Sequence, residues 1–250
     1  MGSDDIQPLV SLSVVSHGQG PLVTTLLQNL LSGLDVPFEV ILTLNLPEDE
    51  GFIERFVEPF KKFPLHIIRN SVPRGFGANH NAAFRHTSCP YFVVVNPDIQ
   101  IGELRLGPLL ENLRDKQRVA ACGPAVHSTA GQLEDNARRF PSVARLMRRV
   151  VLRRRGRDYQ WTDAPIDVDW LAGMFVVFQR PAFQAVGGFD ERYFLYFEDA
   201  DICRRLTQAG WRVQLDPRTS VIHNAQRASH KSLRHFRWHL RSAIRFLLTR

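Results

Sequence analysis

Two acidic motifs and one histidine are the residues of this chain best suited to chemistry. The segment "VVVNPDI" ends an apolar run on Asp98, directly behind Pro97. Proline fixes its own φ and donates no ladder hydrogen bond, so it ends a strand and gives Asp98 a defined direction at the rim of a sheet. A carboxylate in that place either binds a cation or accepts hydrogen bonds from its own turn. The motif alone does not separate the two roles.

A second acidic cluster lies at the start of a predicted helix. Glu198, Asp199 and Asp201 open the segment "EDADICRRLTQAG", and Gly210 follows its last turn. Acids in the first turn and glycine past the end are typical of a helix. Helix charging explains the acids but not the aromatic run "RYFLYF" before them. Aromatic surroundings raise the pKa of a carboxyl group and favour a role as general base.

His223 follows the β-branched run "SVI" at the end of a predicted strand. A single histidine in such a place is more often structural than a ligand, and no HxxH spacing accompanies it. Together with Asp98 and the acids at 198 and 199, however, it is suited to surround a hard divalent cation and a substrate hydroxyl.

Strands and helices alternate through the first half of the chain. We predict strands over residues 8–16, 37–47, 65–70 and 91–98, and helices over 21–34, 48–63 and 77–87. This alternation is typical of a parallel sheet with crossover helices, in which ligands bind at the carboxyl ends of the strands. The polar residues at those ends are Ser16, His17, Asn45, Asn70 and Asp98.

The alternation loosens after Asp98, where we predict a helix over 105–115 and a strand over 119–127. Because no clear linker follows, the second half is interpreted as a continuation of the same domain. The 250 residues, 44% of them hydrophobic, are enough for one large α/β domain.

The charge balance points to anionic partners, because 32 Lys and Arg face 25 Asp and Glu, a net charge of +7. The cysteines Cys89, Cys122 and Cys203 follow no CxxC spacing, so we expect buried thiols and neither disulfides nor a thiolate metal site. The acidic first residues lack a signal-peptide pattern, and no run approaches the roughly 18 apolar residues of a spanning helix. We therefore expect a cytoplasmic protein, at most peripheral on the inner face of the membrane.

Four motifs occur in an order that is specific in combination: "NSVPRGFGANHNAAF", "VVVNPDI", "WLAGMFVVFQRPAFQAVGGFDERYFLYFEDADICRR" and "VIH". From about Leu12 to the C-terminus the chain resembles glycosyltransferase family 2, especially rhamnosyltransferase-like members with an NPD motif. The resemblance implies an α/β GT-A fold, a Rossmann-like, mixed, mostly parallel sheet flanked by helices. A single domain over residues 8–228 would comprise a nucleotide-sugar-binding half (8–100) and an acceptor-binding half (101–228), followed by a basic amphipathic helix at 229–250.

The resemblance also implies transfer of a sugar, with inversion, from a nucleotide-diphosphate donor. Asp98 would bind Mg²⁺ or Mn²⁺ with His223 as a further ligand, and Asp199 would be the general base, with Glu198 orienting the base or the acceptor. Trp170 and Gly173 would line the donor-sugar and acceptor pocket, and Gly75, Phe76 and Asn81 the nucleotide-sugar side. We expect the donor site to include Ser16, His17, Asn45 and Asn96 as well.

Two departures from the family pattern leave the nucleobase open. Asn45 stands where many members carry aspartate, and His17 with Gly18 where tyrosine or threonine with asparagine is commoner. A dTDP-sugar and a UDP-sugar both stay candidates, and we favour rhamnose on thymidine diphosphate. The NPD motif supplies one carboxylate where a DxD motif supplies two, which implies a more loosely held metal.

Arginines gather in two segments. The first, residues 145–157, contains seven, of which Arg153 and Arg154 are expected to bind the phosphates of a lipid-linked acceptor. In the second, apolar residues from Leu233 to Leu247 recur at helical spacing among arginines. Such a helix suits an anionic membrane surface, and packing onto the protein itself is an equal alternative. No RNA- or DNA-binding motif accompanies the arginines, so nucleic acid is not an expected partner.

The expected function is that of an inverting, metal-dependent glycosyltransferase in cell-surface polysaccharide synthesis, acting on a glycan or polyprenyl-diphosphate-linked acceptor. The alternative is a non-catalytic nucleotide-sugar or glycan binding module of an assembly complex, against which the full set of catalytic groups argues. Nucleotidyl transfer to a sugar phosphate is disfavoured, since the chain lacks a glycine-rich N-terminal loop that bears lysine.

Overall fold

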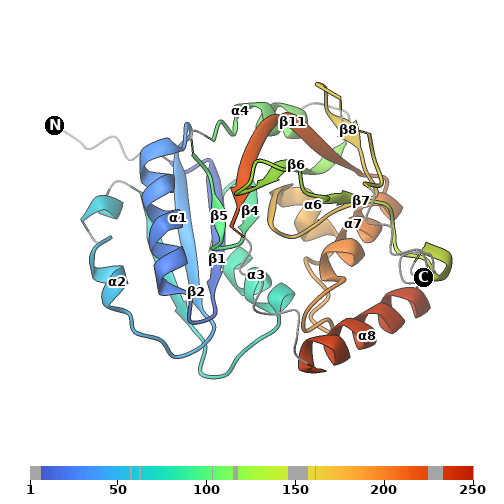
Figure 1. Ribbon diagram of the computed structural model, residues 1–250. Coiled ribbons are helices and arrows are strands. Elements are labelled where there is room, and N and C mark those ends of the chain that lie inside the picture. Colours follow the sequence, from blue (N-terminus) through green and yellow to red (C-terminus); the bar gives the residue numbers. More distant parts are fainter. Residues whose placement is uncertain are drawn as a thin grey trace.

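A mixed β-sheet forms the centre of the molecule in the computed structural model (Figure 1). The structure describes residues 7–56, 58–61, 63–102, 104–114, 118–145, 157–160, 162–224 and 233–249. Within them the sheet has nine strands, in the order β3-β2-β1-β4-β10-β6-β11-β5, with β8 paired to β11. Their bounds are β1 Val10–Ser16, β2 Phe38–Leu44, β3 Leu65–Arg69, β4 Tyr91–Val95, β5 Ile99–Gln100, β6 Val119–Ser128, β8 Ile166–Asp167, β10 Phe175–Gln179 and β11 Arg212–His223.

The first half of the chain builds the parallel part, in which β3, β2, β1 and β4 are parallel neighbours. Strands β1, β2 and β4 are buried on both faces, which explains their continuous apolar sequences. Helix α1 (Gly20–Gly33) covers one face, where Leu26 and Leu27 join Val10, Leu12 and Val40 in a hydrophobic core. Helix α3 (Phe76–Phe84) packs with the other face, where Ala83 joins the second core.

The second half adds antiparallel strands. Strand β10 lies between β4 and β6 and is antiparallel to both, whereas β11 is parallel to β6. Strands β5 and β8 pair antiparallel with β11, and β7 (Ala137–Arg138) with β9 (Trp170–Leu171) forms a small separate sheet. Among the described residues, the helices of this half with both ends defined are α4 (Gly107–Arg114), α6 (Arg180–Ala185), α7 (Glu198–Gln208) and α8 (Leu233–Leu248). The division into a donor half and an acceptor half stays a prediction.

The predicted strands and most predicted helices are confirmed, with one exception. The prediction of one helix over residues 48–63 is wrong: the described residues of this segment form only the short helix α2 (Gly51–Glu54) and a 3₁₀ turn at Pro59–Lys61. Proline cannot donate a helical hydrogen bond and clashes with the preceding turn, so an α-helix does not run through Pro59. No strand is predicted from the sequence over Phe175–Gln179, where the structure has β10.

The predicted C-terminal helix is confirmed as α8, and one side of it packs on the domain. Ser242, Ala243 and Phe246 are buried there, and Ser242 Oγ donates a 2.9 Å hydrogen bond to Leu195 O. Among the described residues, no helix is long and apolar enough to cross a membrane.

The three cysteines are free and buried, as predicted. Burial raises the pKa of Cys89 to about 11 and those of Cys122 and Cys203 to about 12, so all three are neutral thiols at physiological pH.

Helix α3 lies unusually close to the segment that follows α6. A Cβ at Gly75 would be 2.7 Å from Phe194 O, and one at Gly77 would be 2.6 Å from Phe189 Cβ. Asn81 hydrogen-bonds both backbone groups of Phe189, donating from Nδ2 to the carbonyl (2.8 Å) and accepting at Oδ1 from the amide (2.9 Å). These contacts join the parallel half to the part of the chain that carries Glu198 and Asp199.

Replacing Gly77 with alanine tests this close approach. The added methyl would press on Phe189, so we expect the free energy of unfolding to fall by about 1–3 kcal/mol. Gly107→Ala is the matched control, because its methyl group would meet only Asp35 Oδ2, at 3.8 Å. Denaturant unfolding of both variants measures the difference, and a Gly77→Ala protein as stable as the wild type would contradict the expectation.

Candidate active site

The two acids at the start of α7 lie in a largely apolar environment. Asp199 accepts hydrogen bonds from the Gly173 amide at Oδ2 (3.1 Å) and from its own following amide, that of Ala200, at Oδ1 (2.8 Å). Glu198 is only 4% exposed, and within the described part of the chain its Oε2 atom has no hydrogen-bond partner. A small interior gap, with no room for a water molecule, lies beside Asp199 among Val94, Leu171, Phe189 and other apolar side chains.

Burial raises the pKa of both carboxyl groups, but by different balances. For Glu198, burial and then the negative charge of Asp199 raise the pKa well above its usual value. Burial also raises the pKa of Asp199, while the amides of Ala200 and Gly173 and the charge of Arg138 oppose the rise. Of the pair, Glu198 therefore holds a proton more readily, and Asp199 is the carboxylate available as a base.

The turn that presents these acids has a strained backbone. Tyr196 and Phe197 adopt left-handed φ values of 72° and 68°, although neither is glycine. Such residues cost about 1–3 kcal/mol each and persist only where their surroundings hold them. Here α8 does so, because Tyr196 Oη hydrogen-bonds His235 Nδ1 (3.0 Å) and the Phe197 ring packs 5.1 Å from that of His239. The sequence predicts a helix start here but shows no sign of this support.

Asp98 and His223 meet through strand pairing. Strand β5 runs antiparallel to the end of β11, which sets Ile99 opposite His223, and the Asn224 amide donates to Asp98 O (2.9 Å). His223 Nε2 lies 3.2 Å from Asp98 Oδ2, and its Nδ1 lies 2.8 Å from Glu134 Oε2. The predicted proximity of Asp98 and His223 is thus present.

Glu134 was missed in the sequence, since "GQLEDNARR" carries no periodicity or motif that would single it out. Burial opposes protonation of His223, but the hydrogen bonds to Asp98 and Glu134 outweigh it and raise the pKa of the imidazole to about 9. In this state His223 is a cation between two carboxylates.

A divalent cation fits beside Asp98 with limited help from the protein. In the part of the chain that the structure describes, no three His, Cys, Asp or Glu side chains are arranged to hold a metal ion. Asp98 Oδ1 is nevertheless buried without a hydrogen-bond partner, as an unfilled ligand position would be. In this structure Asp98 Oδ2 and His223 Nε2 are hydrogen-bonded to each other (3.2 Å), so an ion held by both atoms would replace the proton between them. Such a site takes two ligands from the chain and the rest from substrate oxygens and water.

The two acidic sites belong to one rim of the sheet. The Asn96 amide, two residues before Asp98, donates to Met174 O (2.9 Å). The neighbouring residue, Gly173, donates its amide to Asp199. A short hydrogen-bonded bridge therefore connects the NPD turn to Asp199. That the two carboxylates lie on opposite sides of a bound sugar stays a prediction.

The side chain of Asn45, a predicted donor-binding residue, already makes its hydrogen bonds within the protein. Its Oδ1 accepts from Asn70 Nδ2 and the Arg74 amide (both 2.8 Å), and its Nδ2 donates to Arg74 O (2.9 Å) and lies 3.0 Å from His17 Nδ1. Asn45 is 1% exposed, so it shapes the loop at residues 71–75. Its contact with the donor stays a prediction.

His17 and Ser16 follow β1 beside Asn45. With Asn45 donating to Nδ1, the neutral His17 ring carries its proton on Nε2, and burial lowers its pKa. Ser16 is buried and its Oγ accepts from the Gln19 amide (3.1 Å). His17 is the more exposed of the two and the better placed to reach a ligand.

The remaining predicted residues fall into three groups. Phe76 lies against Gly173, where a Cβ would be 3.0 Å from the Phe76 ring, so these two residues and Asp199 gather in one place. Trp170 is buried and donates Nε1–H to Arg139 O (3.0 Å), and Asn81 and Gly75 serve the contact between α3 and the segment after α6. The predicted acceptor residues Arg153 and Arg154 lie outside the described residues.

A sheet of this order, with acids at the rim of its parallel part, is that of the GT-A fold. The chain belongs to glycosyl transferase family 2, whose family model matches residues 11–185. The family resemblance noted from the motifs is therefore confirmed, as are the fold and the assignment as an enzyme.

Two curated relatives are similar over almost the whole chain. One is an N-acetylglucosaminyl-diphospho-decaprenol L-rhamnosyltransferase of Mycobacterium tuberculosis, 29% identical over 98% of this chain and 85% of that protein. The other is the rhamnosyltransferase WbbL of Escherichia coli, also 29% identical, over 96% of this chain and 92% of its own length.

Among solved structures, a mannosyltransferase of Pyrobaculum calidifontis in complex with GDP-Man and Mn²⁺ superposes with a TM-score of 0.63. It is 19% identical and matches 96% of this chain, which spans 65% of the length of that structure. At this identity the likeness shows the fold alone.

Replacing Glu198 with glutamine tests, through the stability of the protein, whether burial raises the pKa of this carboxyl group. A carboxyl whose pKa is raised on folding stabilises the protein below its unfolded pKa of about 4.5, and this contribution is lost as the pH rises through the folded pKa. The neutral amide should therefore raise the free energy of unfolding at neutral pH by about 0.5–2 kcal/mol, with no gain below about pH 4.

Denaturant unfolding across this pH range measures the effect of Glu198→Gln. The exposed Glu111 supplies the matched control, Glu111→Gln, which should change stability little at any pH. A loss of stability at Glu198→Gln that is equal at all pH values would mean that burial of the charge is not what the substitution relieves.

Proposed function

We propose that this glycosyltransferase moves rhamnose, with inversion, from a nucleoside-diphosphate donor to a hydroxyl of a lipid-linked, N-acetylglucosamine-bearing acceptor in cell-surface polysaccharide synthesis. The observation that carries the proposal is Asp199, a carboxylate of raised pKa fixed by the Gly173 amide at the rim that also bears Asp98. Similarity to two rhamnosyltransferases, one of them named for a diphospho-decaprenol acceptor, supports the sugar and the acceptor class.

In this proposal Asp199 accepts the proton of the acceptor hydroxyl as that oxygen attacks the anomeric carbon. Its low-polarity surroundings favour taking up a proton, and the two amides hold the carboxylate in one orientation. A protonated Glu198 beside it places no second negative charge near the attacking oxygen and can donate a hydrogen bond to it. Alignment of the hydroxyl with the departing diphosphate supplies much of the remaining rate.

Asp98 and His223 would hold Mg²⁺ or Mn²⁺ on the leaving-group side. When bound, the ion would stabilise the negative charge of the departing diphosphate. The unpartnered Oδ1 of Asp98 and the nearby imidazole nitrogen support this assignment. Glu134 would keep His223 oriented through Nδ1, as second-layer carboxylates do for metal-bound histidines.

For the nucleotide we propose thymidine diphosphate, with uridine diphosphate as the competitor. His17, exposed beside the occupied Asn45, is the side chain that we expect to contact the nucleoside. Because a polyprenyl-linked acceptor is confined to a bilayer, we place the enzyme in the cytoplasm, at the inner face of the membrane.

Asp199→Asn should abolish transfer while donor binding is kept. An amide of the same shape cannot accept the proton, so we expect the turnover rate to fall by about 10²–10⁴-fold with a donor affinity close to that of the wild type. Single-turnover transfer and calorimetric donor titration measure the two quantities. The exposed Asp163 supplies the control, Asp163→Asn, and transfer by Asp199→Asn at the wild-type rate would remove Asp199 from the role of base.

A panel of nucleotide sugars tests the donor sugar, the nucleobase and the metal requirement together. Purified protein is mixed with dTDP-rhamnose and with UDP- and GDP-sugars, each with Mg²⁺, with Mn²⁺ or with EDTA. We expect turnover of dTDP-rhamnose only, at least tenfold above the other donors, lost in EDTA and in Asp98→Ala. Donor binding without turnover under every condition would favour a binding module over an enzyme.

A further inference from the structure

The outer side of α8 exposes most of the large hydrophobic side chains that are exposed anywhere in the described residues. Leu233 is 83% exposed, Phe236 65% and Leu248 78%, and Leu240 and Ile244 are each about half exposed. Elsewhere only Val72, Val143 and Ile222 are comparable, and they are scattered. A contiguous apolar surface of this kind marks an interaction site.

These side chains form one stripe opposite the packed side of the helix. At about 100° per residue, Leu233, Phe236, Leu240, Ile244 and the last two leucines fall within about a third of the helix circumference. Ser242 and Phe246, which are buried, lie across the helix from them. The stripe is therefore not the side that attaches α8 to the domain.

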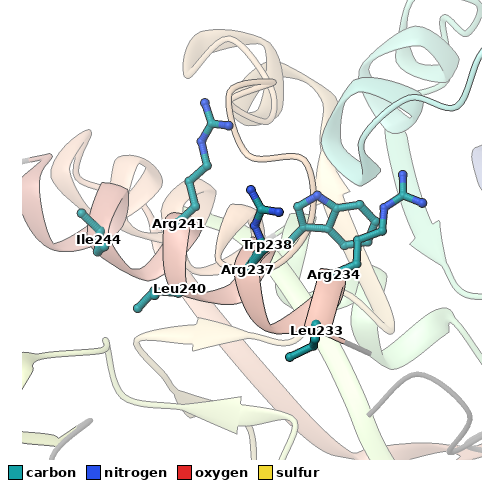
Figure 2. A pocket seen from close by; sticks show the side chains of 7 residues that line it. All are labelled: Leu233, Arg234, Arg237, Trp238, Leu240, Arg241 and Ile244. Atoms are coloured by element: carbon teal, nitrogen blue, oxygen red, sulfur yellow. The ribbon is translucent and has the colours of Figure 1, made fainter. Parts of the chain in front are cut away.

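Positive charge flanks the stripe. Figure 2 shows Arg237 and Arg241 rising from one side of α8 beside Trp238, while Leu233 and Leu240 point to the other. Arg234 stacks on Trp238, with 4.7 Å from its guanidinium carbon to the ring centroid. Residues 233–248 include no acid, and within the described residues neither Arg237 nor Arg241 has a carboxylate partner.

We propose that this surface of α8, defined by Leu233, Phe236, Leu240, Ile244, Arg237 and Arg241, lies in the interface of a membrane that contains anionic lipid. The apolar stripe would enter the boundary between head groups and acyl chains, and the guanidinium groups would bind lipid phosphates. A helix of 16 residues with this stripe suits the plane of a bilayer and not a crossing of it. The combination of an apolar stripe, arginines and no acid complements an anionic lipid surface better than an ordinary protein surface.

The opposite side of α8 packs on the turn before α7, which leads into Glu198 and Asp199. The Trp238 ring packs 4.7 Å from that of Phe194, and Phe197 contacts His239 and Phe246. At the C-terminal end, Arg204 of α7 donates from Nη1 to the carbonyls of Phe246 and Thr249 (both 2.8 Å). Helix α8 is thus joined both to the turn before α7 and to α7 itself.

Membrane contact through α8 would therefore hold Asp199 at a fixed height above the bilayer. This step rests on the proposed function, because only a lipid-linked acceptor makes that height matter. The docking surface itself rests on α8 alone.

Vesicle sedimentation tests the docking surface without any substrate. We expect the intact protein to bind vesicles of phosphatidylcholine with phosphatidylglycerol at least tenfold more tightly than pure phosphatidylcholine, and less tightly as salt is raised. Phe236→Ser with Leu240→Ser should weaken binding at least tenfold, and Arg237→Gln with Arg241→Gln about 10- to 30-fold, since each arginine near such a surface contributes about 1 kcal/mol. Arg85→Gln with Arg114→Gln removes the same charge elsewhere and should bind like the wild type.

The outcomes that would overturn the docking surface are no vesicle binding, equal binding to both lipid compositions, or unchanged binding by the α8 variants. A concentration-dependent dimer that Phe236→Ser with Leu240→Ser abolishes would also overturn it, in favour of a second copy of the chain. Thermal unfolding checks that the variants fold, which is expected because the changed side chains are exposed.

Transfer assays then test the link to catalysis. With the α8 variants, transfer to a lipid-linked acceptor in vesicles should fall at least tenfold, and transfer to a soluble acceptor should stay at the wild-type rate. An equal fall for both acceptors would overturn the link. A wild-type protein that transfers to neither acceptor contradicts the proposed function, while vesicle binding still decides the docking surface.

Discussion

The contact of α3 with the segment after α6 is the constraint on which the active site depends. The two segments lie so close together that there is no room for a methyl group at Gly75 or Gly77. Asn81 stabilises the contact with hydrogen bonds to both backbone groups of Phe189. On one side of this contact are the loops that would meet a nucleotide, and on the other is the chain that runs to Asp199. Any loosening here would separate the donor from the base by a fraction of an ångström or more, and alignment tolerates little of that.

The site handles negative charge in two opposite ways. Around Asp98 the protein supplies a cationic imidazole and hydrogen bonds, a setting suited to phosphate oxygens, and a metal ion bound there would take the place of the imidazole proton. Around Glu198 and Asp199 it removes water and offers only backbone amides to one of the two acids. The first arrangement favours stabilising charge that leaves with the diphosphate, and the second favours taking up a proton.

Sequence reasoning succeeded where local pattern decides structure. The strand end before Asp98, the helix start at Glu198 and the strand end at His223 were all predicted from short motifs and are present, whereas their convergence on one bound sugar stays a prediction. It failed where distant contacts decide. Strand β10 is placed by pairing with β4, some eighty residues earlier, and Glu134 is placed by reaching His223. Periodicity predicted that α8 is amphipathic. It could not predict which side packs on the domain, because that side is set by contacts with α7 and Phe197.

The enclosed thiols of Cys89, Cys122 and Cys203 make the native surface unreactive toward alkylating reagents. One cysteine introduced at an exposed position would then be the sole target of a maleimide dye or spin label. The natural chain thus already serves as a background for site-directed spectroscopy of its helices, without prior replacement of its own sulfur groups.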